Sequence, residues 1–214
     1  MAQNMVGSLW FLKAALALAI AYAAPALADQ PCRIAVLGDS LASSYGLELS
    51  EGFPAQLEEA LDEDGYACEV LDAGVPGDTS AGGLARLDWM LADRPSHVIV
   101  ELGGNDALRA LPSDEMERNL DAIIGRLQEE RIEVLLAGMY APPNLGREYG
   151  EAFAAVFPRV AEEHDVPLYP FFLDGVAGQP ALTQRDGIHP TAEGIAQIVE
   201  NILPTVKRWL DRGA

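Results

Sequence analysis

Basic side chains are scarce in this sequence. Lysine and arginine together number 14, against 33 aspartates and glutamates, and the formal net charge at pH 7 is −19. Lys13 and Lys207 are the only lysines. Nucleic acids and anionic lipids repel so acidic a protein, so the composition argues against both as partners.

Cysteine and histidine are also rare, with two and three residues respectively. Neither Cys32 nor Cys68 has the spacing of metal ligands, so we expect no metal site. Each cysteine stands at the start of a run that we expect to be a strand. If the two strands are adjacent and parallel, a disulfide between them is geometrically feasible, and two separate buried thiols are the alternative.

The hydrophobic run near the N-terminus is shorter than the roughly 20 residues of a membrane-spanning helix. The charge-free apolar stretch there covers only residues 14–24. It ends in Pro25-Ala26-Leu27-Ala28, which has the small-residue pattern of a signal-peptidase site. We interpret residues 1–28 as a secretory signal peptide, with an uncleaved anchor as the alternative. Residues 29–214 are then one periplasmic or secreted domain without stable membrane insertion.

Short apolar runs alternate with segments of helical periodicity through the rest of the chain. The runs expected to form strands are residues 33–37, 68–73, 97–102, 132–137 and 166–169. Helices are expected at residues 52–63, 79–92, 113–127, 147–164 and 191–210, and another begins at 41–45. Repeated strand–helix units indicate an α/β protein, with a five-stranded parallel sheet between two layers of helices.

Four loops of small and polar residues stand out against this pattern. They are Gly38-Asp39-Ser40, Gly77-Asp78-Thr79-Ser80, Gly103-Gly104-Asn105-Asp106 and Asp186-Gly187-Ile188-His189-Pro190. The first three follow strands, and the carboxyl ends of parallel strands meet at one edge of a sheet. Each loop alone is weak evidence, because such residues also form ordinary turns.

Together the loops supply a serine hydroxyl and the residues that could activate it as a nucleophile. Ser40 needs a base to take its proton, and His189 can supply one while Asp186 orients the ring. The backbone N–H groups of Ser40 and Gly77 and the side-chain amide of Asn105 are candidate donors for an oxyanion. We therefore predict Ser40, Asp186 and His189 as catalytic residues.

The order of these motifs resembles that of the SGNH (GDSL) hydrolase family, whose four letters match Ser40, Gly77, Asn105 and His189. Within it, residues 77–87, 103–109 and 143–149 are similar to the multifunctional branch of thioesterase I, protease I or lysophospholipase and of arylesterase. The resemblance implies a flavodoxin-like α/β/α sandwich without cofactor or metal. It also implies hydrolysis of carboxylic esters and thioesters through an acyl-serine intermediate.

The resemblance further implies an acyl-binding groove, with residues 107–112 as its mobile wall and residues 140–145 opposite. The residues expected to contact substrate are Asp39, Leu108, Arg109, Pro143 and Ile188. Asp39 also suits a turn position, and Asp106 is expected to order the loop of Asn105. We expect a monomer acting on a small acyl ester or thioester.

Two other functions remain open at this point. One is a carbohydrate O-acetylesterase of the same fold. The other is a non-catalytic flavodoxin-like module that binds an anion at the loop of Ser40. Ala42 stands where the nucleophile elbow of α/β-hydrolases has a glycine, and this departure favours the SGNH interpretation.

Overall fold

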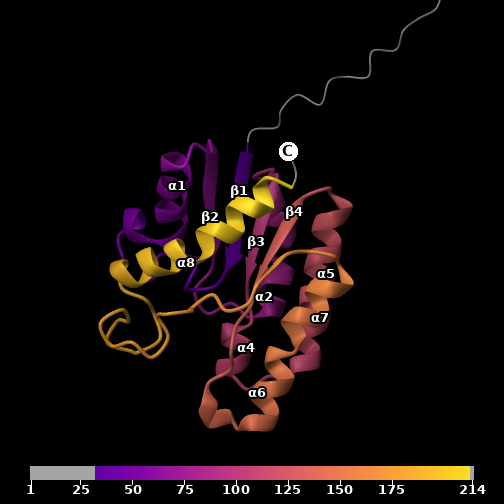
Figure 1. Cartoon of the computed structure of the whole chain (residues 1–214). Helices are drawn as coiled ribbons and strands as arrows, with labels where there is room; N and C mark the ends of the chain where they lie inside the picture. The colour runs from indigo at the N-terminus through magenta and orange to yellow at the C-terminus, as the bar shows by residue number, and fades with distance from the viewer. Residues whose placement is uncertain (1–31, 213–214) are drawn as a thin grey trace, which may run out of the picture. The chain divides into compact units, whose positions relative to one another are not determined.

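A parallel five-stranded sheet lies at the centre of the computed structural model, which describes residues 32–212 (Figure 1). The expected signal peptide, residues 1–28, lies outside the described residues. The strand order is β2-β1-β3-β4-β5. The strands are β1 (Cys32–Gly38), β2 (Cys68–Gly74), β3 (His97–Glu101), β4 (Glu133–Ala137) and β5 (Leu168–Tyr169).

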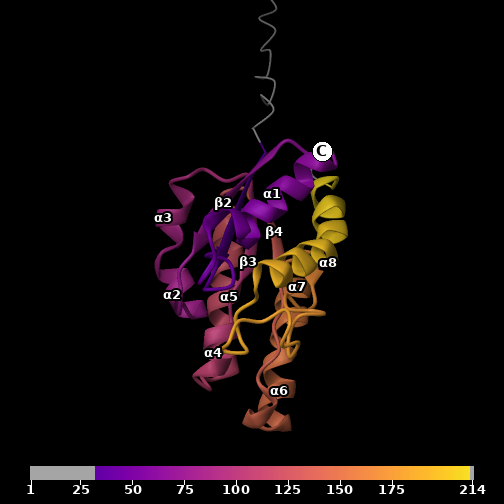
Figure 2. The same ribbon diagram turned by 90° about the vertical axis from the view of Figure 1, so that its left-hand side faces the viewer.

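Helices cover both faces of this sheet, which confirms the predicted α/β sandwich. Figure 2 shows α1 and α8 on one side of the strands and α2 and α3 on the other. The helices are α1 (Phe53–Glu63), α2 (Ser80–Ala85), α3 (Leu87–Leu91), α4 (Gly104–Leu108), α5 (Ser113–Glu129), α6 (Arg147–Ala154), α7 (Val156–Glu163) and α8 (Ala192–Leu210). Short 3-10 turns lie at Leu49–Glu51 and Pro143–Leu145. Within residues 32–212, no helix has both the length and the apolar character needed to cross a membrane.

The burial of each strand follows its place in the sheet. Residues Ile34 to Leu37 of β1 are all at most 1% exposed, because helices cover this central strand on both faces. The edge strand β2 is more exposed: Cys68, Val70 and Ala73 are buried, whereas Glu69 and Asp72 are exposed. In α5 the predicted apolar stripe is buried in full; it comprises Met116, Leu120, Ile123, Ile124 and Leu127.

Two long helices predicted from periodicity are each broken in two. Residues 79–92 divide at Arg86, whose φ of −106° and ψ of 10° end α2. The turn points Trp89 outward, where it is 64% exposed, although the sequence pattern places it inside. Residues 147–164 divide at Ala155, because Pro158 lacks the N–H that would bond to the carbonyl four residues before it.

Two local predictions near the ends of helices were wrong. Leu41–Tyr45 forms turns rather than the start of a helix, and the Ser43 N–H bonds to the carbonyl of Asp39 at 3.2 Å. Ser113 is the first residue of α5, and the capping position belongs to Pro112. Thr79 and Thr191 do cap their helices, since their hydroxyls accept N–H bonds from residues three positions on.

Cys32 and Cys68 face each other across β1 and β2 and form a disulfide, with Cα atoms 4.5 Å apart. The bond closes a loop with a sequence separation of 36 residues, so it restricts the unfolded chain. We expect Cys32→Ser/Cys68→Ser to lower the free energy of unfolding by about 3 to 4 kcal/mol, measured by urea denaturation at equilibrium. The oxidised wild-type protein is the reference. An unchanged denaturation midpoint would contradict this prediction.

Candidate active site

The predicted convergence of loops at the carboxyl edge of the sheet is confirmed. Gly38, the last residue of β1, pairs in register with Gly74 of β2 and Glu101 of β3. The three strands therefore end level with one another. The loops that follow them carry Ser40, Gly77 and Asn105 to the lining of one cavity.

Ser40 lies at one end of a chain of hydrogen-bonding groups. Its Oγ is 2.9 Å from Nε2 of His189, and Nδ1 of that ring is 2.6 Å from Oδ2 of Asp186. The other carboxylate oxygen of Asp186 accepts the N–H groups of Ile188 and His189 at 2.9 and 3.0 Å. The bond from the His189 side chain and these backbone bonds lower the pKa of Asp186 to about 2. The carboxylate is thus ionised near neutral pH and accepts a hydrogen bond from the Nδ1–H of His189, which leaves Nε2 facing the serine.

A residue that sequence reasoning missed, Gln184, ties the loop of His189 to the loop of the serine. The side-chain nitrogen of Gln184 donates to the carbonyls of Tyr45 and Pro190, each at 2.9 Å. Its backbone N–H donates to the carbonyl of His189 at 2.7 Å. The ring of Tyr45 packs against the His189 imidazole, with centroids 4.5 Å apart and an angle of 38° between the ring planes. No sequence motif marks Gln184, because its partner Tyr45 is 139 residues away.

The three candidate oxyanion donors border the same cavity as the serine hydroxyl. Among the hydrogen bonds of residues 32–212, the backbone N–H groups of Ser40 and Gly77 have no acceptor. Gly77 has φ of +86°, a conformation that other L-residues rarely adopt. The Asn105 amide nitrogen donates one bond, to Asp39 Oδ2 at 2.7 Å, and keeps a second N–H.

Side chains from α4 hold the loops of Gly77 and Asn105 together. Asp106 is buried and accepts both the N–H and the hydroxyl of Ser80, at 2.8 and 2.6 Å. Arg109 donates to the carbonyl of Gly77 at 2.7 Å. Arg109 is not among the residues that line the cavity; its bond supports the loop of Gly77, and its contact with substrate stays a prediction.

The cavity has a volume of about 680 Å³ and is mostly apolar. Four of the five residues predicted to contact substrate line it, namely Asp39, Leu108, Pro143 and Ile188. Its other apolar walls come from the loops after β2, β4 and β5, and include Pro76, Met139, Tyr140, Pro142, Phe171 and Leu173. Leu108, Tyr140 and Ile188 are exposed at its mouth, at 50, 57 and 44%.

Two buried carboxyl groups lie behind Ser40, and the sequence pointed to only one of them. Asp39 is 2% exposed, and burial raises its pKa to about 6. Glu101, at the end of β3, is fully buried, and its Oε2 accepts the N–H of Asp39 at 3.3 Å. Burial, with the nearby charge of Asp39, raises the pKa of Glu101 well above its usual range.

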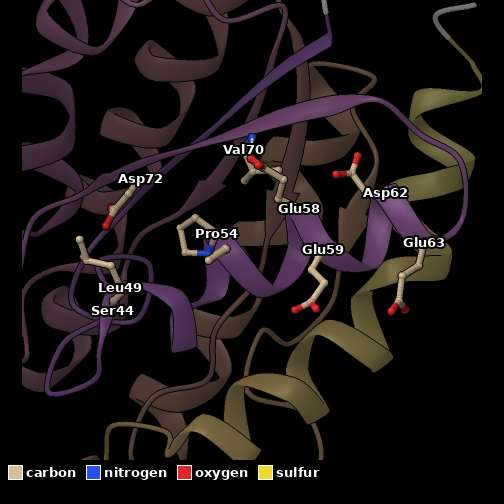
Figure 3. Close-up of a pocket in the computed structure, with 10 residues that line it drawn as sticks. Ser44, Leu49, Pro54, Glu58, Glu59, Asp62, Glu63, Val70 and Asp72 are labelled. Atoms are coloured by element: carbon tan, nitrogen blue, oxygen red, sulfur yellow. Dashed lines mark hydrogen bonds between the residues drawn. The ribbon is translucent and has the colours of Figure 1, made fainter.

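A second hollow, of about 630 Å³, runs along α1 and shares no lining residue with the cavity beside Ser40 (Figure 3). Carboxylates line it, including Glu58, Glu59, Asp62, Glu63 and Asp72. One of these, Glu58, accepts the N–H of Val70 at 2.6 Å. Within residues 32–212, no three His, Cys, Asp or Glu side chains are grouped so as to hold a metal ion.

Comparison with known proteins agrees with this geometry. Residues 36–196 match the model of the GDSL-like Lipase/Acylhydrolase family. The chain is 43% identical to Esterase TesA of Pseudomonas aeruginosa over 176 residues, which cover 82% of this chain and 88% of that protein. It is 42% identical to Thioesterase 1/protease 1/lysophospholipase L1 of Escherichia coli K12 over 159 residues, covering 74% and 75%.

A solved structure extends the likeness to three dimensions. The psychrotrophic esterase EstA from Pseudoalteromonas sp., inhibited by monoethylphosphonate, superposes with a TM-score of 0.79 at 34% identity, and the match covers 84% of this chain and 98% of EstA. The family match covers most of the described residues, and sequence, fold and site agree. The chain is a serine ester hydrolase of the GDSL (SGNH) lipase/acylhydrolase family.

Proposed function

We propose that Ser40 is the nucleophile, His189 the general base and acid, and Asp186 the residue that orients and supports His189. The observation that carries this proposal is the unbroken Ser40–His189–Asp186 series at 2.9 and 2.6 Å, which opens into an apolar cavity. The substrates we propose are carboxylic esters and thioesters.

In the first half of the reaction, Nε2 of His189 takes the hydroxyl proton as Ser40 Oγ bonds to the acyl carbon. The carbonyl electron pair moves onto oxygen, where the N–H groups of Ser40, Gly77 and Asn105 stabilise it. The tetrahedral intermediate collapses, the bond to the leaving alcohol or thiol breaks, and His189 returns the proton to it. Water then attacks the acyl-serine by the same steps and releases the carboxylic acid.

The lining of the cavity supports an acyl chain as the bound group. Its walls near Leu108, Met139 and Phe171 offer apolar contact rather than the several hydrogen-bonding groups that a sugar ring needs. We therefore favour an acyl esterase over a carbohydrate O-acetylesterase. Carboxylates at Asp39 and Asp186, in a protein of net charge −19, also disfavour the binding of an anion.

We propose that the enzyme acts outside the cytoplasm, after removal of residues 1–28. The disulfide between Cys32 and Cys68 supports this, because such bonds persist in oxidising compartments. We also propose that it acts as a monomer, since Ser40, His189 and Asn105 all come from one chain.

A series of p-nitrophenyl esters tests the proposal. We expect kcat/KM to rise from acetate to hexanoate by roughly fourfold per CH₂, because each buried CH₂ contributes about 0.8 kcal/mol. A fluorophosphonate should inactivate the enzyme at one equivalent, with the adduct on the peptide containing Ser40. An adduct elsewhere would contradict the assignment of the nucleophile. Acetate release from acetylated xylan without activity on longer esters would favour the carbohydrate esterase.

A further inference from the structure

Asp39 lies between the nucleophile and the proposed oxyanion donor, and each of its two oxygens has its own partner. Oδ1 accepts the N–H of Leu41 at 3.0 Å, which shapes the turn that carries Ser40. Oδ2 accepts the Asn105 side-chain nitrogen at 2.7 Å. The carboxylate is buried and 66 residues from Asn105 in sequence, so the folded sheet alone brings the two together.

The bond to Asp39 decides which way the Asn105 amide faces. An ionised carboxylate only accepts hydrogen bonds, so it selects the amide nitrogen and rejects the amide oxygen. One N–H of Asn105 then points to Asp39, and the second remains available on the same nitrogen. Because Asn105 lines the cavity beside Ser40, that second N–H is the one that can meet an oxyanion.

The surrounding groups favour a single negative charge on Asp39. Glu101 of β3 is the closest carboxyl group, and its deep burial favours its protonated form. Burial raises the pKa of Asp39 to about 6, which is still below neutral pH; the charge of Asp78 also raises it, and the charge of His189 lowers it. The Leu41 and Asn105 bonds lower it as well, so the ionised form of Asp39 has two donors in place.

We propose that Asp39 is a positioning residue for the oxyanion-stabilising amide: its carboxylate holds Asn105 in the orientation that turns one N–H toward the reacting carbonyl oxygen. This inference rests on the proposed roles of Ser40 and Asn105. It replaces the expectation that Asp39 contacts substrate, because the side chain is only 2% exposed and its two oxygens already accept bonds from Leu41 and Asn105.

The substitution Asp39→Asn tests this orientation directly. The new amide keeps the size of the side chain, and its oxygen can still accept the Leu41 N–H. Its NH₂ then faces Asn105, which must rotate to offer its oxygen and so withdraws its N–H from the oxyanion. We expect kcat for p-nitrophenyl butyrate to fall about 10²- to 10³-fold with KM nearly unchanged, as for loss of one oxyanion donor.

Asp72→Asn is the matched control. Asp72 is also near the end of a strand, and its Oδ1 accepts the Gly74 N–H at 2.9 Å, the same bond to the N–H two residues on that Asp39 makes. Its side chain lies in the acidic hollow along α1 rather than in the cavity (Figure 3). We expect its kcat and KM to match those of the wild-type enzyme. If Asp72→Asn lost as much activity as Asp39→Asn, the effect would come from removing a carboxylate charge or its local backbone bond. That result would overturn the inference.

A double-mutant cycle separates action through Asn105 from any other role of Asp39. If Asp39 acts through the amide, Asp39→Asn has no further effect once Asn105→Ala has removed it. Fully additive losses in Asp39→Asn/Asn105→Ala would overturn the inference, as would wild-type kcat in Asp39→Asn. Fluorophosphonate labelling of the wild-type enzyme tests the nucleophile independently. If Ser40 is labelled but Asp39→Asn keeps its kcat, only the positioning role fails; if Ser40 is not labelled, the proposed nucleophile fails.

Asp39→Ser provides a second variant that keeps the test open if Asp39→Asn folds poorly. A serine hydroxyl can accept the Leu41 N–H but is too short to reach Asn105. Asp39→Ser removes the hydrogen bond that orients the Asn105 amide but does not force the amide to turn over. We therefore expect kcat to fall about tenfold, less than in Asp39→Asn. An unchanged kcat in Asp39→Ser would overturn the positioning role.

Discussion

Replacing Ser40 by alanine is expected to lower kcat for p-nitrophenyl butyrate by about 10⁴- to 10⁶-fold and to leave the protein folded. Without Oγ no acyl-serine forms, and only the oxyanion donors and substrate binding remain to assist water. The structure predicts little change in stability, because the Ser40 hydroxyl bonds only to the ring of His189 among the described residues. Initial rates and the thermal unfolding midpoint measure the two effects.

Ser43→Ala is the control for this experiment. Ser43 lies three residues along in the same turn, and its buried Oγ has no hydrogen-bond partner within residues 32–212. The same chemical change there should leave kcat close to that of the wild-type enzyme. More than about 1% residual activity in Ser40→Ala, free of wild-type protein, would refute Ser40 as the nucleophile.

Asp186→Asn is expected to lower kcat by about 10⁴-fold. The carboxylate of Asp186 accepts a hydrogen bond from the Nδ1–H of His189, but an asparagine NH₂ placed there donates to Nδ1 instead. The ring then carries its proton on Nε2, which faces Ser40 as a donor and cannot act as a base. Steady-state rates at pH 7 give the effect, with Asp72→Asn as the control for the loss of a carboxylate. Retention of a tenth of the activity would exclude the orienting role.

The pH dependence of stability gives a second measurement on this variant. The pKa of Asp186 is lowered to about 2 from a usual value of 3.8, so the folded state binds this proton less readily than the unfolded state. The stabilisation is therefore complete above pH 3.8 and is lost as the pH falls through 2. The side chain is 41% exposed, so solvent screens the effect. Urea denaturation should show a gap between Asp186→Asn and wild-type protein at pH 7 that narrows toward pH 2.

Local sequence predicted the elements well where the apolar pattern is clear, as a stripe in a helix or as an uninterrupted run in a central strand. The stripe of α5 and the apolar run of β1 both follow from periodicity, which depends on neighbouring residues alone. The breaks at Arg86 and Ala155 were not predicted. At Arg86 the side chain bonds to Asp78 and to the carbonyl of Gly38, and the second contact arises only when β1 lies beside β2.

The sequence by itself determined which chemical groups are present and which loops carry them, because small and polar residues after apolar runs mark strand ends wherever they occur. Only the tertiary structure decided which groups meet. Ser40 and His189 are 149 residues apart, and Asp39 and Asn105 are 66 apart. Their contacts depend on strand order and register, which bring β1 and β3 side by side and end them level. For the same reason no local pattern marked Gln184 or Glu101, whose roles exist only between loops that folding brings together.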